Sequence, residues 1–491
     1  MPLRSASAAS GSVLAAVRRR LQHRRRSPAP VVGLVLSGGG ASASFQVGAL
    51  RYLYDVVGIA PTVITGTSAG SILAALLAQA DDHEGQRRVL DEVERRYEHL
   101  RTPADIMVEL DWFAEVQKLV PALQRLGQNR ASHLDPQPPA APTASGRSGP
   151  SMRSEPLPSG RHRPRRREPS PARGTLAVLW NVTRSRPDFE ALLRGARQEQ
   201  SLYRRGPIFD ELLGPDLLDE GRLARSGTEL RVAVVALESG ELRYVTGRGV
   251  LVDRADQPVG GEGPVSLVDA VHASCAIPAV YAPVALGAEH YVDGGTRENL
   301  PVAIATRLGV TRCYAVNALP TGVPTDTSYA DKDLLAIVLR TTAGIMSDEV
   351  QLDDLTRAQA AGAVLIAPEV DVLGVLEVDP GLLAIAKDYG YVRAAEACED
   401  ASPSDQRTTR HLIELRRRIW TEENDRAVVA PDSPAGSRTE LATLKWQLRD
   451  LLALVPPNRL PPGAELWWQG WEGHVVEIDE PVAWVVDAPY G

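Results

Sequence analysis

Two consecutive strand–glycine–helix units near the start of the chain restrict its fold more than any other feature. The first has an apolar run at 31–36, three consecutive glycines and a segment of helical period over 45–56. The second has a β-branched run at 62–65, a glycine-rich turn and an apolar helical segment from residue 72. Strands that alternate with helices through short turns form a parallel sheet covered by helices. The sequence therefore predicts an α/β fold.

Composition excludes several classes of protein. Of the 491 residues, 44% are hydrophobic and 24% are charged, which rules out a wholly disordered or fibrous chain. No uninterrupted apolar stretch approaches roughly 18 residues, so we expect no membrane-spanning helix. The three cysteines are too scattered for a disulfide framework or a structural zinc site. We therefore predict a cytoplasmic protein, and leave open whether it also binds peripherally to a membrane.

The charge is distributed unevenly along the chain. The net charge is −8, yet residues 1–29 carry seven arginines and no acidic residue. Residues 130–174 carry nine arginines against three acidic residues and are rich in Pro and Ser. We expect a basic flexible N-terminal tail and a disordered insertion. The remaining body is acidic, which argues against nucleic-acid binding, whereas contact of the tail with an anionic membrane and a merely solvated tail both stay open.

The insertion interrupts a main domain that we expect to span residues 30–430. A C-terminal extension over 431–491 contains five of the eight tryptophans. Its Ser437–Glu440 segment is typical of a capping box that opens a helix, here running to Leu454. Two alternating segments between 474 and 486 predict a terminal hairpin. We expect the tryptophans to pack against the main domain rather than to bind lipid.

The glycine-rich turn of the second unit fits the nucleophile pattern G-x-S-x-G. Gly66 and Gly70 flank Ser68, between a predicted strand and a predicted helix. A nucleophile elbow needs this context, because the sharp turn leaves no room for side chains on either side of the serine. The helix N-terminus would favour developing negative charge on the serine oxygen. An ordinary glycine-rich turn is the alternative interpretation.

The three glycines of the first unit allow two functions. Backbone N–H groups of Gly38, Gly39 and Gly40 could converge on an oxyanion. The same run also fits a dinucleotide fingerprint, G-x-G-x-x-A. That fingerprint requires an acidic residue at the end of the second strand, whereas Asp55 precedes that strand. Acyl chemistry is therefore the favoured interpretation.

A serine nucleophile needs a base. None of the nine histidines has a recognisable setting. Asp293 instead follows a short β-rich run and precedes Gly294 and Gly295, which would let the backbone turn sharply towards a pocket. The spacing alone does not show that Asp293 meets Ser68.

Taken together, these motifs resemble the patatin-like phospholipase family. The Gly-rich loop, the G-x-S-x-G motif and the D-G-G aspartate occur in the family's order, and residues 273–284 are similar to the block that precedes the aspartate. The resemblance covers about residues 31–129 and 175–320. It implies a three-layer α/β/α fold with a mostly parallel central sheet. It also implies a Ser68–Asp293 dyad that uses neither histidine, metal nor cofactor.

The resemblance implies a serine acyl hydrolase that cleaves carboxylic esters of lipids or phospholipids. Ser68 would attack the acyl carbonyl, Asp293 would take its proton, and the oxyanion would be held by backbone N–H groups. The expected N–H donors are those of Gly38, Gly39, Gly40 and Ala41. The alternatives are a weakly active or inactive relative that binds lipid or a partner, and a nucleotide-binding enzyme. The sequence does not reveal the oligomeric state.

The chain departs from the family pattern at Ser42 and Ala43, where the family usually has a basic residue and a glycine. A cation at position 42 would attract anionic substrates. We therefore expect Ser42→Arg to raise turnover of anionic phospholipid, unless Ala43 leaves too little room for the arginine.

Overall fold

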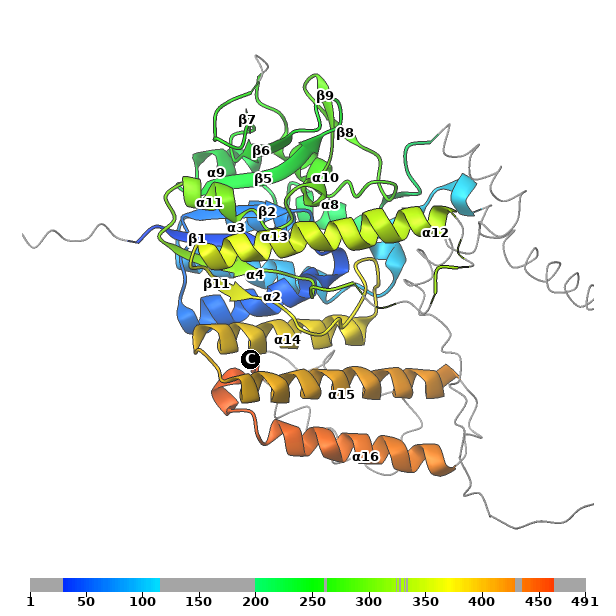
Figure 1. Ribbon diagram of the computed structural model, residues 1–491. Helices are drawn as coiled ribbons and strands as arrows, with labels where there is room; N and C mark the ends of the chain where they lie inside the picture. Colours follow the sequence, from blue (N-terminus) through cyan, green and yellow to red (C-terminus); the bar gives the residue numbers. More distant parts are fainter. Residues whose placement is uncertain are drawn as a thin grey trace, which may run out of the picture.

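A nine-stranded mixed sheet with helices on both faces forms the body of the protein (Figure 1). In this computed structural model, the described residues are 30–114, 199–259, 263–323, 325, 328–330, 332, 334–428 and 435–462. The strands of the sheet are β1 (Val32–Leu36), β2 (Val63–Thr67), β5 (Glu229–Ala236), β6 (Leu242–Thr246), β7 (Leu251–Val252), β8 (Val284–Leu286), β9 (Glu289–Asp293), β10 (Arg312–Val316) and β11 (Val364–Ile366). The predicted α/β fold is confirmed.

The sheet is parallel at its centre and antiparallel beyond β5. Strands β11, β10, β1, β2 and β5 lie side by side in parallel pairs. Strands β6 and β9 both pair with β5 in the antiparallel sense, and β7 and β8 extend those two pairings. The carboxyl ends of the five parallel strands therefore share one edge of the sheet, where α/β proteins place their sites.

The alternating side chains of the central strands fill two cores. In β1, Leu34 and Leu36 join the larger core, whereas Val35 joins the smaller core on the opposite face. The larger core is covered by α2 (Ala43–Tyr52), α3 (Ala69–Leu77), α4 (His83–Tyr97), α10 (Leu267–Ser274) and α14 (Pro380–Cys398). The smaller core is covered by α11 (Val302–Arg307) and α13 (Ser347–Ala360). This arrangement is the predicted three-layer architecture.

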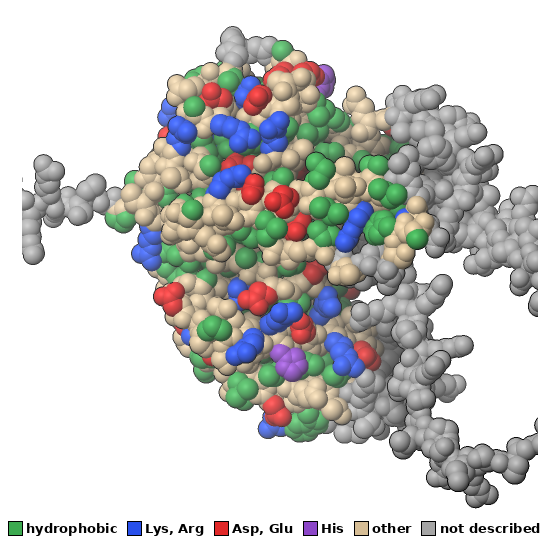
Figure 2. Space-filling model, viewed as in Figure 1, with side chains coloured by type: hydrophobic (Ala, Val, Ile, Leu, Met, Phe, Trp, Pro, Cys, Tyr) green, Lys and Arg blue, Asp and Glu red, His purple; other side chains and the backbone are tan. Residues whose placement is uncertain are grey.

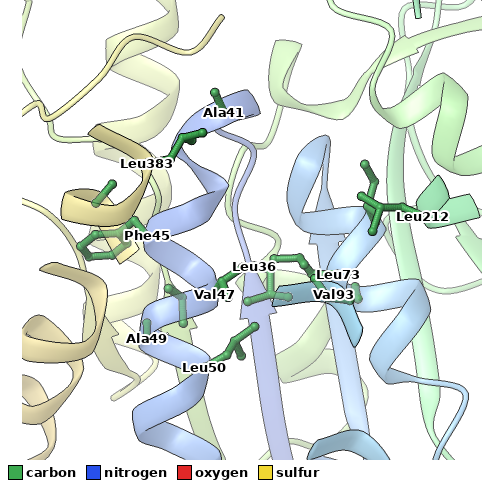
Figure 3. Packing of buried hydrophobic residues seen from close by; sticks show 14 of the residues in the cluster. Leu36, Ala41, Phe45, Val47, Ala49, Leu50, Leu73, Val93, Leu212 and Leu383 are labelled. Atoms are coloured by element: carbon green, nitrogen blue, oxygen red, sulfur yellow. The ribbon is translucent and has the colours of Figure 1, made fainter. Parts of the chain in front are cut away.

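Helix α14 packs tightly on α2, the helix that follows the three glycines. A Cβ atom on Gly48 would collide with the backbone carbonyl of Lys387, and one on Gly390 would collide with that of Phe45. The glycines let the two helix backbones approach closely, and the rings of Phe45 and Tyr389 meet edge to face at 5.5 Å. Figure 3 shows Phe45 and Leu383 between these two helices. The contact fixes α2, and with it the loop that precedes α2.

Two further helices continue from α14. Helix α15 (Pro403–Val428) packs on α14, and α16 (Ala435–Leu452) packs on α15, as Figure 1 shows. A C-terminal helix is thus present as α16, which ends two residues before Leu454. The predicted capping box is wrong, because the helix begins at Ala435 and Ser437–Glu440 lies within it. The remaining helices are α8 (Pro207–Leu213), α9 (Glu220–Arg225) and α12 (Leu334–Leu339). The short 3₁₀ helices are η1 (Gly40–Ser42), η3 (Pro103–Asp105), η4 (Gly294–Thr296) and η6 (Pro457–Arg459), and the π-helical segments are η2 (Leu53–Val57) and η5 (Arg340–Met346).

Several predictions from the sequence lie outside the described residues. These are the basic tail at 1–29, the insertion at 130–174, the terminal hairpin and all the C-terminal tryptophans except Trp446. The structure also has a two-stranded sheet of β3 (Met107–Glu109) and β4 (Tyr203–Arg205) that the sequence did not indicate. None of the described helices is long and apolar enough to cross a membrane.

Candidate active site

Ser68 occupies a strained turn between β2 and α3. Its backbone has a φ of 51° and a ψ of −130°, a conformation that residues other than glycine rarely adopt. A Cβ atom on Gly66 would lie 2.5 Å from the carbonyl oxygen of Gly70, and one on Gly70 would lie 2.7 Å from that of Leu36. Both glycines are therefore required by close backbone contacts. The turn has the geometry expected of a nucleophile elbow.

Sheet register brings Asp293 to Ser68. Thr67 of β2 pairs with Ala233 of β5, and Asp293 of β9 pairs with the next residue, Val234. Because β6 occupies the other side of β5, the strands β2 and β9 approach the same edge of β5 from opposite directions. Their carboxyl ends meet there, and the Ser68 hydroxyl lies close enough to the Asp293 carboxylate to lower its pKa.

The Asp293 carboxylate is buried and has few hydrogen-bond partners. The residue is 6% exposed, and burial raises the pKa of its carboxyl to about 6. The nearby Ser68 hydroxyl and the Gly295 N–H, which donates to Oδ1 at 2.8 Å, favour the ionised form and lower the pKa in part. A Cβ atom on Gly294 would lie 2.6 Å from the Ala233 carbonyl oxygen, so this turn also needs its glycine. A carboxylate so placed can accept the Ser68 proton near neutral pH.

The Gly-rich loop lies against the serine. A Cβ atom on Gly38 would lie 2.9 Å from the Cβ of Ser68. The N–H of Gly38 already donates to the backbone and side-chain oxygens of Asn299, at 3.2 and 3.1 Å. The N–H of Ala41 donates to the carbonyl oxygen of Val375 at 2.8 Å. Of the four predicted donors, these two are therefore engaged within the protein.

The N–H groups of Gly39 and Gly40 have no acceptor among the residues that the structure describes. Gly40 adopts a φ of 54°, and its Cβ would lie 2.8 Å from a methyl group of Val375. This left-handed conformation is available to glycine at little cost. The loop thus leaves two adjacent backbone donors free beside Ser68.

Two residues that the motifs did not single out support this arrangement. The Ser274 hydroxyl accepts the N–H of Ser68 at 2.9 Å and donates to the Ala233 carbonyl at 2.7 Å. Asn299 holds Gly38, and its own N–H donates to the Asp354 carboxylate at 2.6 Å. Ser274 lies in the segment that resembles the family's fourth block, which was the available signal. No sequence motif indicated Asn299, because its contacts depend on tertiary structure.

The side chain at position 42 does not face solvent. Ser42 is 4% exposed, and its hydroxyl donates to the carbonyl oxygen of Leu373 at 3.2 Å. Ala43 is also fully buried. The position that the family usually fills with a basic residue is enclosed in this chain.

None of the described histidines forms a hydrogen bond with Ser68. His272 packs edge-on against Phe209, and burial lowers its pKa to about 4, with the Arg205 cation acting in the same direction. His290 is exposed and contacts Glu238 at 2.7 Å. Asp293 is therefore the titratable group whose pKa the Ser68 hydroxyl influences in the described structure.

An apolar pocket opens beside Ser68. Gly40, Ala41 and Ser68 form one part of its wall. The rest of the wall is mostly aliphatic and aromatic: Ala69, Ile72, Tyr97, Leu100, Ile106, Ile208, Phe209, Leu212, Cys275, Ile277, Tyr281 and Leu376. A hydrocarbon chain would be buried favourably in such a pocket.

Known proteins resemble this chain to different degrees. A family model described as patatin-like phospholipase matches residues 34–306, more than half of the chain, and includes both Ser68 and Asp293. No curated protein sequence matches the chain.

Some solved structures are similar to the chain at low sequence identity. VipD from Legionella pneumophila is 15% identical to this chain. The match covers 94% of this chain and 92% of VipD, with a TM-score of 0.30. The type III effector protein ExoU is 15% identical over 91% of this chain and 76% of its own, with a TM-score of 0.18. The heterodimeric ExoU–SpcU complex from Pseudomonas aeruginosa is 13% identical, and the match covers 91% of this chain and 90% of that one, with a TM-score of 0.20.

Proposed function

The chain belongs to the patatin-like phospholipase family, and we propose that it hydrolyses carboxylic ester bonds of lipids through Ser68 and Asp293. Family membership supports a lipid acyl hydrolase in general. The observation that carries the specific mechanism is the sheet register that brings the Ser68 hydroxyl beside the buried Asp293 carboxylate, close enough to lower its pKa. A hydroxyl in this position can lose its proton as it attacks a carbonyl carbon.

In the acylation step, Ser68 Oγ attacks the ester carbonyl while its proton passes to Asp293. The carbonyl oxygen becomes an oxyanion, which the free N–H groups of Gly39 and Gly40 stabilise. The tetrahedral intermediate collapses, the bond to the alcohol breaks, and the alcohol leaves with the proton from Asp293. Ser68 then carries the acyl group as an ester.

In the deacylation step, Asp293 takes a proton from a water molecule as the water oxygen attacks the acyl-serine. A second oxyanion forms at the same two N–H groups. Its collapse releases the carboxylic acid and returns the proton to Ser68 Oγ. Each cycle consumes one ester bond and one water molecule.

The apolar pocket supports lipid esters as the substrate class. Its aliphatic and aromatic wall begins at Ser68, so an ester whose carbonyl lies at the serine would place its acyl chain along this wall. Burial of each methylene group contributes about 0.8 kcal/mol. Esters with longer acyl chains should therefore bind more tightly than short ones.

The nucleotide-binding alternative has no comparable support. The strand end at which a dinucleotide site needs an acidic residue is occupied by Thr67 and Ser68.

The alternative of a weakly active or inactive relative is decided by experiment. Fatty acid released from phospholipid should be measured for the wild-type chain, Ser68→Ala and Ser404→Ala.

Ser404 is exposed on α15 and serves as the matched control. We expect hydrolysis by the wild type and Ser404→Ala, and almost none by Ser68→Ala. Equal release by all three proteins, or none by the wild type, would contradict the proposed function.

A further inference from the structure

The helix that follows β10 extends beyond the edge of the sheet at which Ser68 lies. Elements α12, η5 and α13 succeed one another without a break over residues 334–360. At 1.5 Å per residue this stretch is roughly 40 Å long, whereas a five-residue strand spans only about 17 Å. The chain enters this helix after leaving the carboxyl end of β10, so the helix starts at the carboxyl edge of the parallel strands. The helix is longer than the strands, as Figure 1 shows.

The α13 part of this helix is anchored at the active-site edge. The Gln351 side chain donates to the carbonyl oxygens of Leu319 and Pro320, at 3.2 and 3.1 Å, just after β10 ends. Asp354 accepts the N–H of Asn299, the residue that holds the Gly-rich loop. The residues that precede this anchored part, in α12 and η5, therefore lie beyond the edge that carries Ser68.

The α12–η5 part presents an apolar stripe to solvent. Its apolar members are large and exposed: Ile337 by 46%, Val338 by 43%, Ile345 by 51% and Met346 by 61%. Together with Thr341 and Thr342 they form pairs that recur every four residues, so they share one face of the helix. We refer to these six residues as the apolar stripe.

The two threonines do not make the stripe polar. The Thr341 hydroxyl donates to the carbonyl oxygen of Ile337, and the Thr342 hydroxyl donates to that of Val338 at 2.8 Å. Each hydroxyl is thus hydrogen-bonded within the helix, as threonines on helices in apolar surroundings commonly are. The stripe can leave water without losing these hydrogen bonds.

The charges around the stripe favour a lipid surface. Between residues 334 and 347 the sequence contains a single charged residue, Arg340, and no acidic residue. The first acidic side chain beyond, Asp348, accepts the N–H of Gly322 at 2.7 Å. Figure 2 shows hydrophobic side chains gathered over the α12 end of this helix, whereas charged side chains, mostly acidic, lie over α13.

We propose that the apolar stripe docks the protein on a lipid surface and brings the Ser68 edge of the sheet towards it. This inference rests on the proposed function, which requires access to substrate held in such a surface. Six side chains on one projecting helix are far fewer than the about 20–30 residues per partner of a stable protein interface. Apolar side chains with one cation instead suit the boundary between acyl chains and phosphate head groups.

The docking is tested by flotation of the full chain with vesicles of phosphatidylcholine and phosphatidylglycerol. The double variant Ile345→Asp with Met346→Asp should lose at least tenfold in vesicle binding and a similar factor in hydrolysis of vesicle phospholipid. Its hydrolysis of a water-soluble short-chain ester should stay within twofold of the wild type. Leu454→Asp, which changes a leucine that is 69% exposed after α16, is the matched control and should bind as the wild type does.

A gain-of-binding variant guards against misfolding. Thr341→Val with Thr342→Val makes the stripe more apolar and should bind vesicles more tightly than the wild type. Vesicle binding does not require catalysis, so a protein that binds but hydrolyses neither substrate would refute the proposed function and leave docking supported. Equal binding by the wild type and the aspartate variant would overturn docking. A wild-type dimer that the aspartate variant dissociates would overturn it in favour of a second copy of the chain.

Discussion

Ser68 and Asp293 meet because β2 and β9 end head to head along one edge of β5. Thr67 lies opposite Ala233 and Asp293 opposite Val234, so consecutive residues of β5 set the separation of the two side chains. The Ser274 hydroxyl, bound to both the Ser68 N–H and the Ala233 carbonyl, ties the end of β2 to β5. Sheet register rather than loop conformation therefore defines the candidate dyad.

Removal of either member of the dyad should abolish most of the activity. Ser68→Ala and Asp293→Asn should each lower kcat for ester hydrolysis by roughly 10³-fold or more, and the double variant should be little worse, because the pair acts as a unit. Steady-state kinetics on a short-chain ester provide the measurement, with thermal melting to confirm folding. Half the wild-type activity in either variant would be inconsistent with the mechanism.

The activity should depend on pH through the Asp293 carboxyl. Its pKa is raised to about 6, and only the ionised carboxylate can accept the Ser68 proton. We therefore expect kcat/KM to fall as the pH decreases through about 6 and to reach a plateau above it. A His272→Gln variant should give the same profile, because His272 does not contact Ser68. A shift of the pH profile in His272→Gln would contradict the assignment of this titration to Asp293.

The elbow glycines should be intolerant of any side chain. A Cβ atom at position 70 would lie 2.7 Å from the Leu36 carbonyl oxygen, so Gly70→Ala should lower the free energy of unfolding by more than about 2 kcal/mol. Gly263→Ala is the control, since a Cβ atom there meets nothing within 4 Å. Chemical denaturation of both variants measures the difference. Similar stabilities for the two variants would mean that the turn is less constrained than described.

The apolar pocket should select for acyl-chain length. Ile208 lines the pocket, and Ile208→Trp should fill part of the space beside Ser68. We expect at least a tenfold rise in KM for an ester with a long acyl chain and less than a twofold change for an acetate ester. Ile208→Val, which keeps the pocket open, serves as the control. A uniform change for both esters would place the acyl chain elsewhere.

Position 42 should not accept a cation without cost. Ser42 is 4% exposed and bound to the Leu373 carbonyl, so an arginine there would be crowded and would lose its hydration. Ser42→Arg should therefore lower Tm by several degrees more than Ser42→Ala, and should not raise the ratio of anionic to neutral substrate turnover. A stable arginine variant with an increased ratio would restore the expectation drawn from the sequence.

The sequence predicted those parts of the site that depend on local geometry. Glycines at 66 and 70 indicated the strained turn, and Gly294 and Gly295 indicated the turn after Asp293, because each reflects a close approach of the backbone within a few residues. The contact of Ser68 with Asp293 could not be predicted from spacing, since it depends on the pairing of both β2 and β9 with β5. The role of Asn299 was hidden for the same reason.

In the fold, too, the sequence predicted features that arise locally and missed features that depend on contacts between distant segments. Alternation of strands and helices predicted the parallel centre of the sheet. The antiparallel strands beyond β5 and the close packing of α14 on α2 arise from contacts between distant segments. The engagement of the Gly38 and Ala41 N–H groups, which leaves Gly39 and Gly40 as donors, likewise depends on Asn299 and Val375.

The central claim is that Ser68 is a nucleophile activated by Asp293, and labelling with a fluorescent phosphonate that traps active serines tests it most directly. Mass spectrometry of the labelled wild-type chain should locate the adduct on Ser68. The labelling rate should fall by at least about 10²-fold in Asp293→Asn and remain unchanged in Ser404→Ala. An adduct on another serine, or a rate unaffected by Asp293→Asn, would contradict the account.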